Sequence, residues 1–467
     1  MQADLLLDDV VTRIEGPLLY ARREARVGLN AAVEVVGSDG RARLGRVAAL
    51  DESSMVIEVL EPSSGLAMSG TRLRLRPEPL LFGVGPDMLG RVYDSLGRPI
   101  DGGPPVAARA RMRIEGAAIN PAWRELPRDF IETGVTAIDL MNSLVRGQKL
   151  PLFSAGGLPH DRLATEIASR ARLRDRAGSD FAIVFVGMGV SHDAADRFRG
   201  AMESSGALGH TALFLNLADE PGMQRLLTPR YALTAAEYLA FVEGRHVLVI
   251  LTDMTNYCEA LREVSASHGE IPSRKGYPGY MYSDLATIYE RAGSAQGAAG
   301  TVTQLPILTM PADDISHPIP DLTGYITEGQ IVLDRALDRR GVYPPINVLP
   351  SLSRLFDQGT GEGYTHADHP SLAQQLFASY AKATRVRVLA SVVGQEGLTA
   401  ADRRYLAFAD RFERELVAQD TARRLDESMM VGWRLLTDLP RADLTRLNDA
   451  QIARNVVPAT PQENADG

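Results

Sequence analysis

The hydrophobic and polar positions of this chain follow three patterns, one after another. Up to about residue 76, apolar residues alternate with polar ones or form short runs, and turn-forming residues separate the runs at 38–40 and 61–65. Short strands with this spacing are typical of a small barrel or sandwich. An irregular all-β lobe remains the alternative for this part of the chain.

From about residue 77 the pattern changes to long apolar runs separated by amphipathic segments, around 194–205 and 233–242. The three clearest runs are FAIVFVG at 181–187, TALFLNL at 211–217 and HVLVILT at 246–252. Near-continuous apolar runs are typical of parallel strands that are buried on both faces. Their alternation with helical segments predicts a doubly wound α/β domain.

Beyond about residue 360 the apolar residues recur at helical spacing. Leu372, Leu376 and Tyr380 are four residues apart, and a second such set begins at Phe408. The pair Thr399 and Asp402 resembles a capping box at the start of a helix. The last hundred residues are therefore predicted to form a helical bundle.

Composition narrows the class of protein further. A net charge of −9 and the absence of a basic patch give no reason to expect nucleic acid, because Arg72, Arg74 and Arg76 alternate on a predicted strand and suit a solvated sheet face. The single cysteine, Cys258, excludes an internal disulfide. No apolar run reaches the roughly 18–20 residues that span a bilayer. The N-terminal segment lacks the basic region of a secretory signal, so membrane contact is expected only through partners.

The segment 149–173 has the form of a phosphate-binding loop without its chemistry. It reads as a short strand, a turn containing Gly156 and Gly157, and a helix. In G-x-x-x-x-G-K-[ST], the lysine meets the phosphates and the hydroxyl holds Mg²⁺. Pro159, His160 and Asp161 occupy the matching place. His160 has two interpretations, a phosphate contact at a helix N-terminus and a polar residue at a contact between protein chains, and the second is favoured. Asp161 would repel a phosphate and is interpreted as the helix N-cap.

Two further polar residues follow apolar strands. Asp253 ends the run at 246–252, where an aspartate can hold Mg²⁺, but without the lysine and hydroxyl a helix N-cap is the favoured interpretation. Arg354 follows the strand in PPINVLPSLSRL at 344–355 and is placed to point out of the domain. From the sequence alone, a surface ion pair is the favoured interpretation of Arg354.

Several long stretches, in the same order, closely resemble the B subunit of V/A-type rotary ATPases. They are MLGRVYDSLGRPIDG at 88–102, RGQKLPLFSAGGLPH at 146–160, HVLVILTDMTNYCEALREVSA at 246–266, GYPGYMYSDLATIYERAG at 276–293, HPIPDLTGYITEGQI at 317–331, PPINVLPSLSRL at 344–355 and LTAADRRYLAFADRFE at 398–413. The resemblance implies a β-barrel over 1–76, a RecA-like nucleotide-binding-type domain over 77–359 and an α-helical domain over 360–467.

The same resemblance implies a function and a set of site residues. Three such chains would alternate with three catalytic A subunits in an A3B3 ring, with central shaft and peripheral stalk subunits as further partners, on the cytoplasmic side of a membrane. ATP or ADP with Mg²⁺ would bind at the interface with the catalytic A subunit, where Ser353 and the arginine finger Arg354 would meet it in trans. The degenerate loop with Gly156, Gly157 and His160 would be empty, and this chain would hold no metal. Reactions in such a ring are coupled to transport of H⁺ or Na⁺.

Two other functions remain to be weighed against this one. A self-sufficient NTPase needs the phosphate-gripping lysine and a water-activating carboxylate. Catalytic rotary subunits carry that carboxylate at the place that reads Gly187 to Val190 here, where no carboxylate occurs. A pure scaffold would have no need of an arginine at position 354. The sequence therefore favours a non-catalytic ring subunit that contributes to a partner's site.

Overall fold

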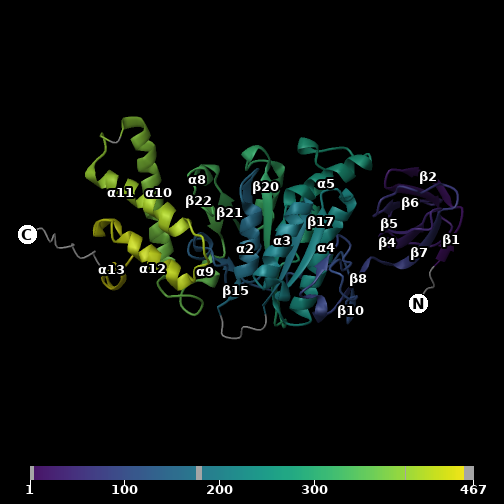
Figure 1. Cartoon of the computed structure of the whole chain (residues 1–467), viewed down its shortest axis with the longest axis horizontal. Helices are drawn as coiled ribbons and strands as arrows, with labels where there is room; N and C mark the ends of the chain where they lie inside the picture. The colour runs from purple at the N-terminus through teal and green to yellow at the C-terminus, as the bar shows by residue number, and fades with distance from the viewer. Residues whose placement is uncertain (1–4, 175–180, 395, 457–467) are drawn as a thin grey trace, which may run out of the picture.

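The structure is a computed structural model of the chain, and it describes residues 5–174, 181–394 and 396–456. Three parts follow one another along the long axis, from a strand-rich part at the N-terminal end to helices at the C-terminal end (Figure 1). This order agrees with the three patterns in the sequence. Within the described residues, no helix combines the length and the apolar character needed to cross a membrane.

The N-terminal part is one antiparallel sheet of seven strands, in the order β1-β7-β4-β5-β6-β3-β2, around its own hydrophobic core. The strands are β1 (Leu5–Leu7), β2 (Val11–Glu15), β3 (Leu18–Arg22), β4 (Ala31–Val36), β5 (Ala42–Leu50), β6 (Ser54–Val59) and β7 (Arg72–Pro79). A single continuous sheet agrees with a barrel and not with two facing sheets. Arg74 and Arg76 form exposed ion pairs with Glu34 on β4, which confirms the solvated sheet face.

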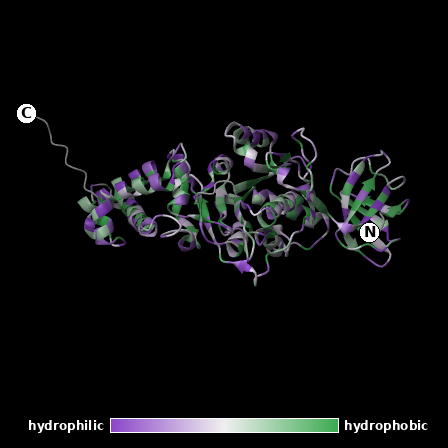
Figure 2. Cartoon of the chain, turned by 90° about the horizontal axis from the view of Figure 1, so that it is seen from below, coloured by the Kyte–Doolittle hydropathy of each residue, from purple (hydrophilic) through white to green (hydrophobic). Residues whose placement is uncertain are grey.

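The central part is built on a sheet in the order β22-β21-β14-β20-β18-β16-β17-β9, parallel except for β22 against β21. Its strands are β9 (Val92–Tyr93), β14 (Leu152–Ala155), β16 (Phe181–Val190), β17 (Thr211–Leu217), β18 (His246–Thr252), β20 (Thr301–Met310), β21 (Gly329–Leu333) and β22 (Ile346–Ser353). Alternate residues of β16 belong to two separate cores, Ile183 and Phe185 to one, Ala182 and Val184 to the other. The sheet is therefore buried on both faces, as the apolar runs predict, and hydrophobic colour follows its strands in Figure 2.

Helices cover both faces of this sheet. One core includes residues of α2 (His160–Arg170) and α3 (His192–Ser204), and the other includes residues of α4 (Gly222–Phe241), α5 (Met254–Ser267), α6 (Met281–Tyr289) and α7 (Pro318–Ile326). Shorter helices are α1 (Thr136–Asp139), α8 (Arg335–Arg339) and α9 (Phe356–Gly359). The sequence-derived domain limits at 76 and 359 fall within β7 and at the end of α9.

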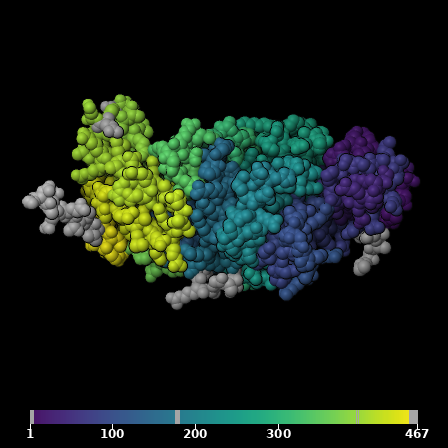
Figure 3. Space-filling view, in the orientation of Figure 1, coloured from purple at the N-terminus to yellow at the C-terminus, as the bar shows by residue number. Residues whose placement is uncertain are grey.

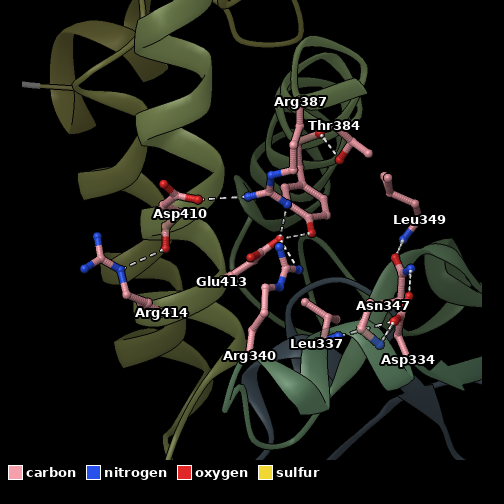
Figure 4. A network of polar contacts seen from close by, with 12 residues as sticks. Asp334, Leu337, Arg340, Asn347, Leu349, Thr384, Arg387, Asp410, Glu413 and Arg414 are labelled. Atoms are coloured by element: carbon pink, nitrogen blue, oxygen red, sulfur yellow. Dashed lines mark hydrogen bonds and ion pairs between the residues drawn. The ribbon is translucent and has the colours of Figure 1, made fainter. Parts of the chain in front are cut away.

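The C-terminal part consists of α10 (His369–Val393), α11 (Ala400–Arg411), a π-helical turn (Phe412–Val417), α12 (Leu425–Leu436) and α13 (Asp449–Asn455). The predicted capping box of Thr399 and Asp402 is confirmed at the start of α11. These helices share one continuous core with a face of the central sheet, and they pack broadly against the central part in Figure 3. Glu413 adds a polar tie across this contact, because it pairs with Arg340 after α8 and with Arg387 on α10 (Figure 4).

Candidate functional site: a degenerate phosphate loop and an exposed arginine

The degenerate loop keeps the strand–loop–helix frame, but some of its backbone N–H groups donate hydrogen bonds to carbonyls of the same loop. It connects β14 to α2, and Gly157 adopts a left-handed φ of 82°. The Leu158 N–H donates to the Ala155 carbonyl (3.0 Å), and the His160 N–H donates to the Leu158 carbonyl (2.9 Å). A phosphate loop needs such N–H groups to face the anion. Two of the loop's donors are therefore committed to the turn itself.

His160 faces the protein on both sides of its ring. Its Nδ1 lies 3.0 Å from the Ser154 hydroxyl, and its Nε2 lies 3.6 Å from a carboxylate oxygen of Asp161. The side chain is 15% exposed. These contacts hold His160 as a polar residue within the loop, and its role at a contact between protein chains stays a prediction.

Asp161 is not the N-cap of α2, so that prediction is wrong. The helix begins at His160, the cap position is Pro159, and no side chain caps this end. Asp161 therefore lies inside the first turn, where its carboxylate accepts a hydrogen bond from the Thr252 hydroxyl (3.4 Å). A carboxylate still interacts favourably with the helix dipole there, and its charge disfavours a phosphate at the same place.

Asp253, in contrast, is the N-cap of α5, as predicted. One carboxylate oxygen accepts from the N–H groups of Thr255 (2.7 Å) and Thr309 (3.1 Å), and the other accepts from the Thr309 hydroxyl. Burial raises the pKa of this carboxyl group, although the hydrogen bonds oppose the shift. Both oxygens are engaged by protein donors, so this aspartate does not fit the role of a free Mg²⁺ ligand.

An arginine that the sequence did not single out hydrogen-bonds to the degenerate loop. Arg335 donates to the Gly156 carbonyl (2.9 Å) and to both carboxylate oxygens of Asp313 (2.8 and 3.0 Å). The Arg335 hydrogen bond lowers the pKa of Asp313. Arg335 and Gly156 are 179 residues apart, so no local pattern could reveal the contact.

Two asparagines from neighbouring elements, one on β17 and one on α5, contact the end of β16, where a catalytic subunit would need a carboxylate. Asn216 accepts from the Gly189 N–H (3.0 Å), and Asn256 donates to the Met188 carbonyl (2.9 Å). Neutral amides cannot take a proton from water as a general base does. Together with the occupied loop amides and Asp253, they make this chain's own loop a poor fit for Mg²⁺–ATP and its hydrolysis.

Arg354 lies directly after β22 and is exposed. Ser353 pairs with Gly329 at the start of β21, and the Arg354 N–H donates to the Glu328 carbonyl (3.0 Å). Within the part of the chain that the structure describes, the Arg354 guanidinium makes no hydrogen bond or ion pair. The surface ion pair that the sequence alone favoured is therefore not formed with any described residue, and none of these residues competes with an outside ligand or partner for this guanidinium.

Ser353 turns its hydroxyl toward the interior of the domain. The group donates to the Ser143 carbonyl (2.9 Å) and accepts from the Gln148 side-chain amide (3.0 Å), and the residue is buried. The side chain thus anchors the backbone just before Arg354.

A hollow of about 460 Å³ opens at the end of β22, next to α9 and α10, and Ser353 lines it. Leu352 and Phe377 line it and are 49% and 42% exposed. Exposed large apolar side chains at such a hollow are typical of a protein contact surface.

Comparison with known proteins extends these observations. Residues 11–74 match the beta-barrel domain of the ATP synthase alpha/beta family, residues 134–353 match its nucleotide-binding domain, and residues 358–456 match the C-terminal domain of V and A type ATP synthase. The fold and the loop frame thus define a member of the ATP synthase alpha/beta class, and the N-terminal sheet is its barrel.

Individual relatives narrow the class. The chain is 51% identical over 446 residues to a V-type ATP synthase beta chain of Halothermothrix orenii and 52% identical over 446 residues to the B subunit of the A-type ATP synthase of Aeropyrum pernix, covering 95% of this chain and 96% of each relative. A solved ATP synthase subunit, NeqB from Nanoarcheaum equitans, matches with a TM-score of 0.72 at 36% identity, over 91% of this chain and 100% of that one. The chain belongs to the B-subunit family of V/A-type ATP synthases.

Proposed function

We propose that this chain is the non-catalytic, regulatory B subunit of a rotary ATP synthase, and that Arg354 acts in trans on a nucleotide held by the catalytic A subunit. The observation that carries the proposal is the exposed guanidinium of Arg354, which pairs with no described residue, together with a phosphate loop in which two N–H donors are already used within the turn. The chain lacks the lysine and the hydroxyl that ATP hydrolysis in its own loop would need, and it carries an arginine that suits the site of a neighbouring subunit.

The sheet topology suits a ring in which each chain has two different neighbours. β22 runs antiparallel to β21, so Arg354 lies at the amino end of the parallel strands, while the degenerate loop follows the carboxyl end of β14. Head-to-tail contacts between unlike surfaces close into rings. Alternation with A subunits in an A3B3 ring would bring Arg354 to one neighbour and the degenerate loop to the other.

At the interface with the A subunit, ATP or ADP with Mg²⁺ would be held mainly by the partner. A bound nucleotide would supply a γ-phosphoryl group whose oxygens gain charge during transfer. The planar Arg354 fork can donate two parallel hydrogen bonds to such oxygens, and an arginine supplied in trans stabilises the transition state of phosphoryl transfer. Ser353, whose hydroxyl is bonded inside the domain, would contribute by fixing the backbone and not by touching the nucleotide. The complex would sit on the cytoplasmic side of a membrane and couple the reaction to H⁺ or Na⁺ transport through other subunits.

Reconstitution tests this proposal. The rigorously purified chain should hydrolyse no ATP alone, and turnover should appear when it is mixed with a catalytic A subunit in equal amounts. ATP hydrolysis by the isolated chain that disappears on mutation of its own loop at His160 would overturn the proposal and favour a self-sufficient NTPase.

A further inference from the structure

We propose that Gln148 is a positioning residue for Arg354, because its buried amide holds the two backbone segments that meet at the base of this arginine. The inference rests on the proposed function of Arg354 and adds the residue that fixes the backbone from which the Arg354 side chain extends. An exposed arginine has several free torsions, so what the domain can fix is the place from which the side chain starts.

The amide of Gln148 bridges the two strand ends next to Arg354. Its Nε2 donates to the Glu328 carbonyl (3.1 Å), just before β21, and to the Ser353 hydroxyl (3.0 Å), at the end of β22. Its Oε1 accepts from the Val145 N–H (3.0 Å), and the residue is fully buried. Every polar atom of this side chain has a partner, so its orientation is fixed.

Both polar groups of Glu328 are held, the backbone carbonyl by Gln148 and the side-chain carboxylate by Lys149. Its carbonyl accepts from Gln148 and from the Arg354 N–H, and its carboxylate accepts from the Lys149 N–H (2.7 Å) and lies 3.0 Å from the Lys149 ammonium. The same ammonium also pairs with Glu290 (2.8 Å). The carbonyl that receives the Arg354 N–H therefore has little freedom to move.

The ends of β21 and β22 that meet before Arg354 are also closely packed. A Cβ atom placed on Gly329 would lie 2.0 Å from the Leu352 carbonyl oxygen, and Gly329 has a φ of 129°. The backbones of β21 and β22 thus approach closely at this point, so any shift of either strand end on loss of the Gln148 bridge would carry Arg354 with it. Misplacement of a catalytic group by about 1 Å can cost on the order of 100-fold in rate.

The test is a double-mutant cycle in the assembled ring. Gln148→Leu keeps the side-chain volume approximately and removes the three hydrogen bonds. Gln419→Leu is the matched control, because Gln419 is also buried, accepts from the Thr136 N–H and donates to the carbonyls of Gly134 and Thr421. It lies near the other end of β22, where its N–H donates to the Tyr343 carbonyl.

Both variants should lower the stability of the chain by similar amounts, but only Gln148→Leu should lower kcat, by about 10- to 100-fold, with KM for ATP changed little. In an Arg354→Ala ring, Gln148→Leu should cause no further loss, since the group that it positions is gone. If Gln148→Leu does not fold, Ser353→Ala removes the hydroxyl that Gln148 holds and should show the same dependence on Arg354.

Two outcomes would overturn this inference and leave the proposed function intact: near wild-type kcat for Gln148→Leu, or an equal loss with and without Arg354. An Arg354→Ala ring with near wild-type turnover would instead overturn the proposed function itself. The cycle therefore separates the two failures.

Discussion

Arg354 and His160 lie at opposite ends of the same central sheet. Ser353, before Arg354, pairs with Gly329 at the first residue of β21, whereas His160 follows the last residue of β14, which runs parallel to β21. One end carries a guanidinium that pairs with no described residue, and the other carries a loop in which two N–H groups bond within the turn. This separation is what the proposed function requires of a chain that contributes to one neighbour's site.

His160→Ala should leave ATP turnover of the assembled ring within a few-fold of wild type. The reason is that its ring contacts Ser154 and Asp161 and is only 15% exposed, so under the proposed function no nucleotide depends on it. Steady-state hydrolysis by rings of confirmed composition measures this. Collapse of activity in an intact ring would mean that the degenerate loop binds a ligand that matters.

Asp253→Asn should preserve both stability and turnover, because asparagine caps a helix about as well as aspartate does. Asp253→Ala should lower the free energy of unfolding by roughly 1–3 kcal/mol through the lost cap and the lost Thr309 hydrogen bonds. Chemical unfolding of the isolated chain and hydrolysis by the ring give the two readouts. A loss of more than about tenfold in kcat for an intact Asp253→Asn ring would instead indicate a metal ligand.

Glu413→Gln should destabilise the contact between the central and C-terminal parts. The carboxylate accepts from the Tyr380 hydroxyl (2.7 Å), Arg387 (2.7 Å) and Arg340 (3.0 Å), and its side chain is only 5% exposed (Figure 4). Hydrogen bonds to a charged group each contribute about 1.5–3 kcal/mol. Because both arginines are partly solvated, we expect a total loss of about 2 kcal/mol in urea unfolding.

The neighbouring pair provides the control for Glu413. Asp410 also pairs with Arg387 (2.9 Å), but its side chain is 63% exposed. Asp410→Asn should therefore cost less than about 1 kcal/mol. Equal stability of the two variants would show that Glu413 does not stabilise this contact.

His369 should make the stability of the chain fall in weak acid. Its Nε2 donates to the Leu140 carbonyl (3.0 Å), its Nδ1 lies 3.0 Å from the Thr365 hydroxyl, and burial lowers its pKa to about 4. Between pH 6.5 and about 4, the unfolded chain binds a proton here that the folded chain does not, so the free energy of unfolding falls as pH falls, by at most about 1.4 kcal/mol per pH unit.

Unfolding measured at several pH values in wild type and His369→Gln isolates this group from the carboxylates. The wild-type curve should be steeper between pH 4 and 6.5, and the difference between the curves should level off above that range. Parallel curves across it would contradict the assignment.

The sequence predicted the three-part fold because each part has a local signature: short alternating strands, apolar runs buried on both faces, and helical spacing. It could not predict that α10 and α12 share a core with the sheet, because that depends on how the parts pack. It placed the helix N-cap at Asp161, two residues late, since Pro159 takes the cap position without a side-chain bond.

For the candidate site too, the sequence predicted the local features but not the contacts between distant residues. The loop frame and the position of Arg354 after a strand are local features. The free state of the Arg354 guanidinium depends on which charged groups the fold brings near. The Gln148 contact with Ser353 spans 205 residues, so only the folded structure reveals it.

The most direct test of the account is ATP turnover by rings that carry Arg354→Ala. The residue lies at an exposed edge, so the chain should fold and assemble, and a 3:3 composition can be confirmed by mass. Arg354→Lys keeps the charge but lacks the planar fork, and Arg339→Ala removes another exposed arginine of the same domain.

We predict that steady-state hydrolysis falls by about 10³-fold or more in the Arg354→Ala ring, the scale on which a trans arginine acts, or roughly 4 kcal/mol of transition-state stabilisation. Arg354→Lys should rescue little, nucleotide affinity should fall less than turnover, and Arg339→Ala should remain near wild type. An intact Arg354→Ala ring that hydrolyses ATP at a near wild-type rate would contradict the central claim and leave this chain as a scaffold.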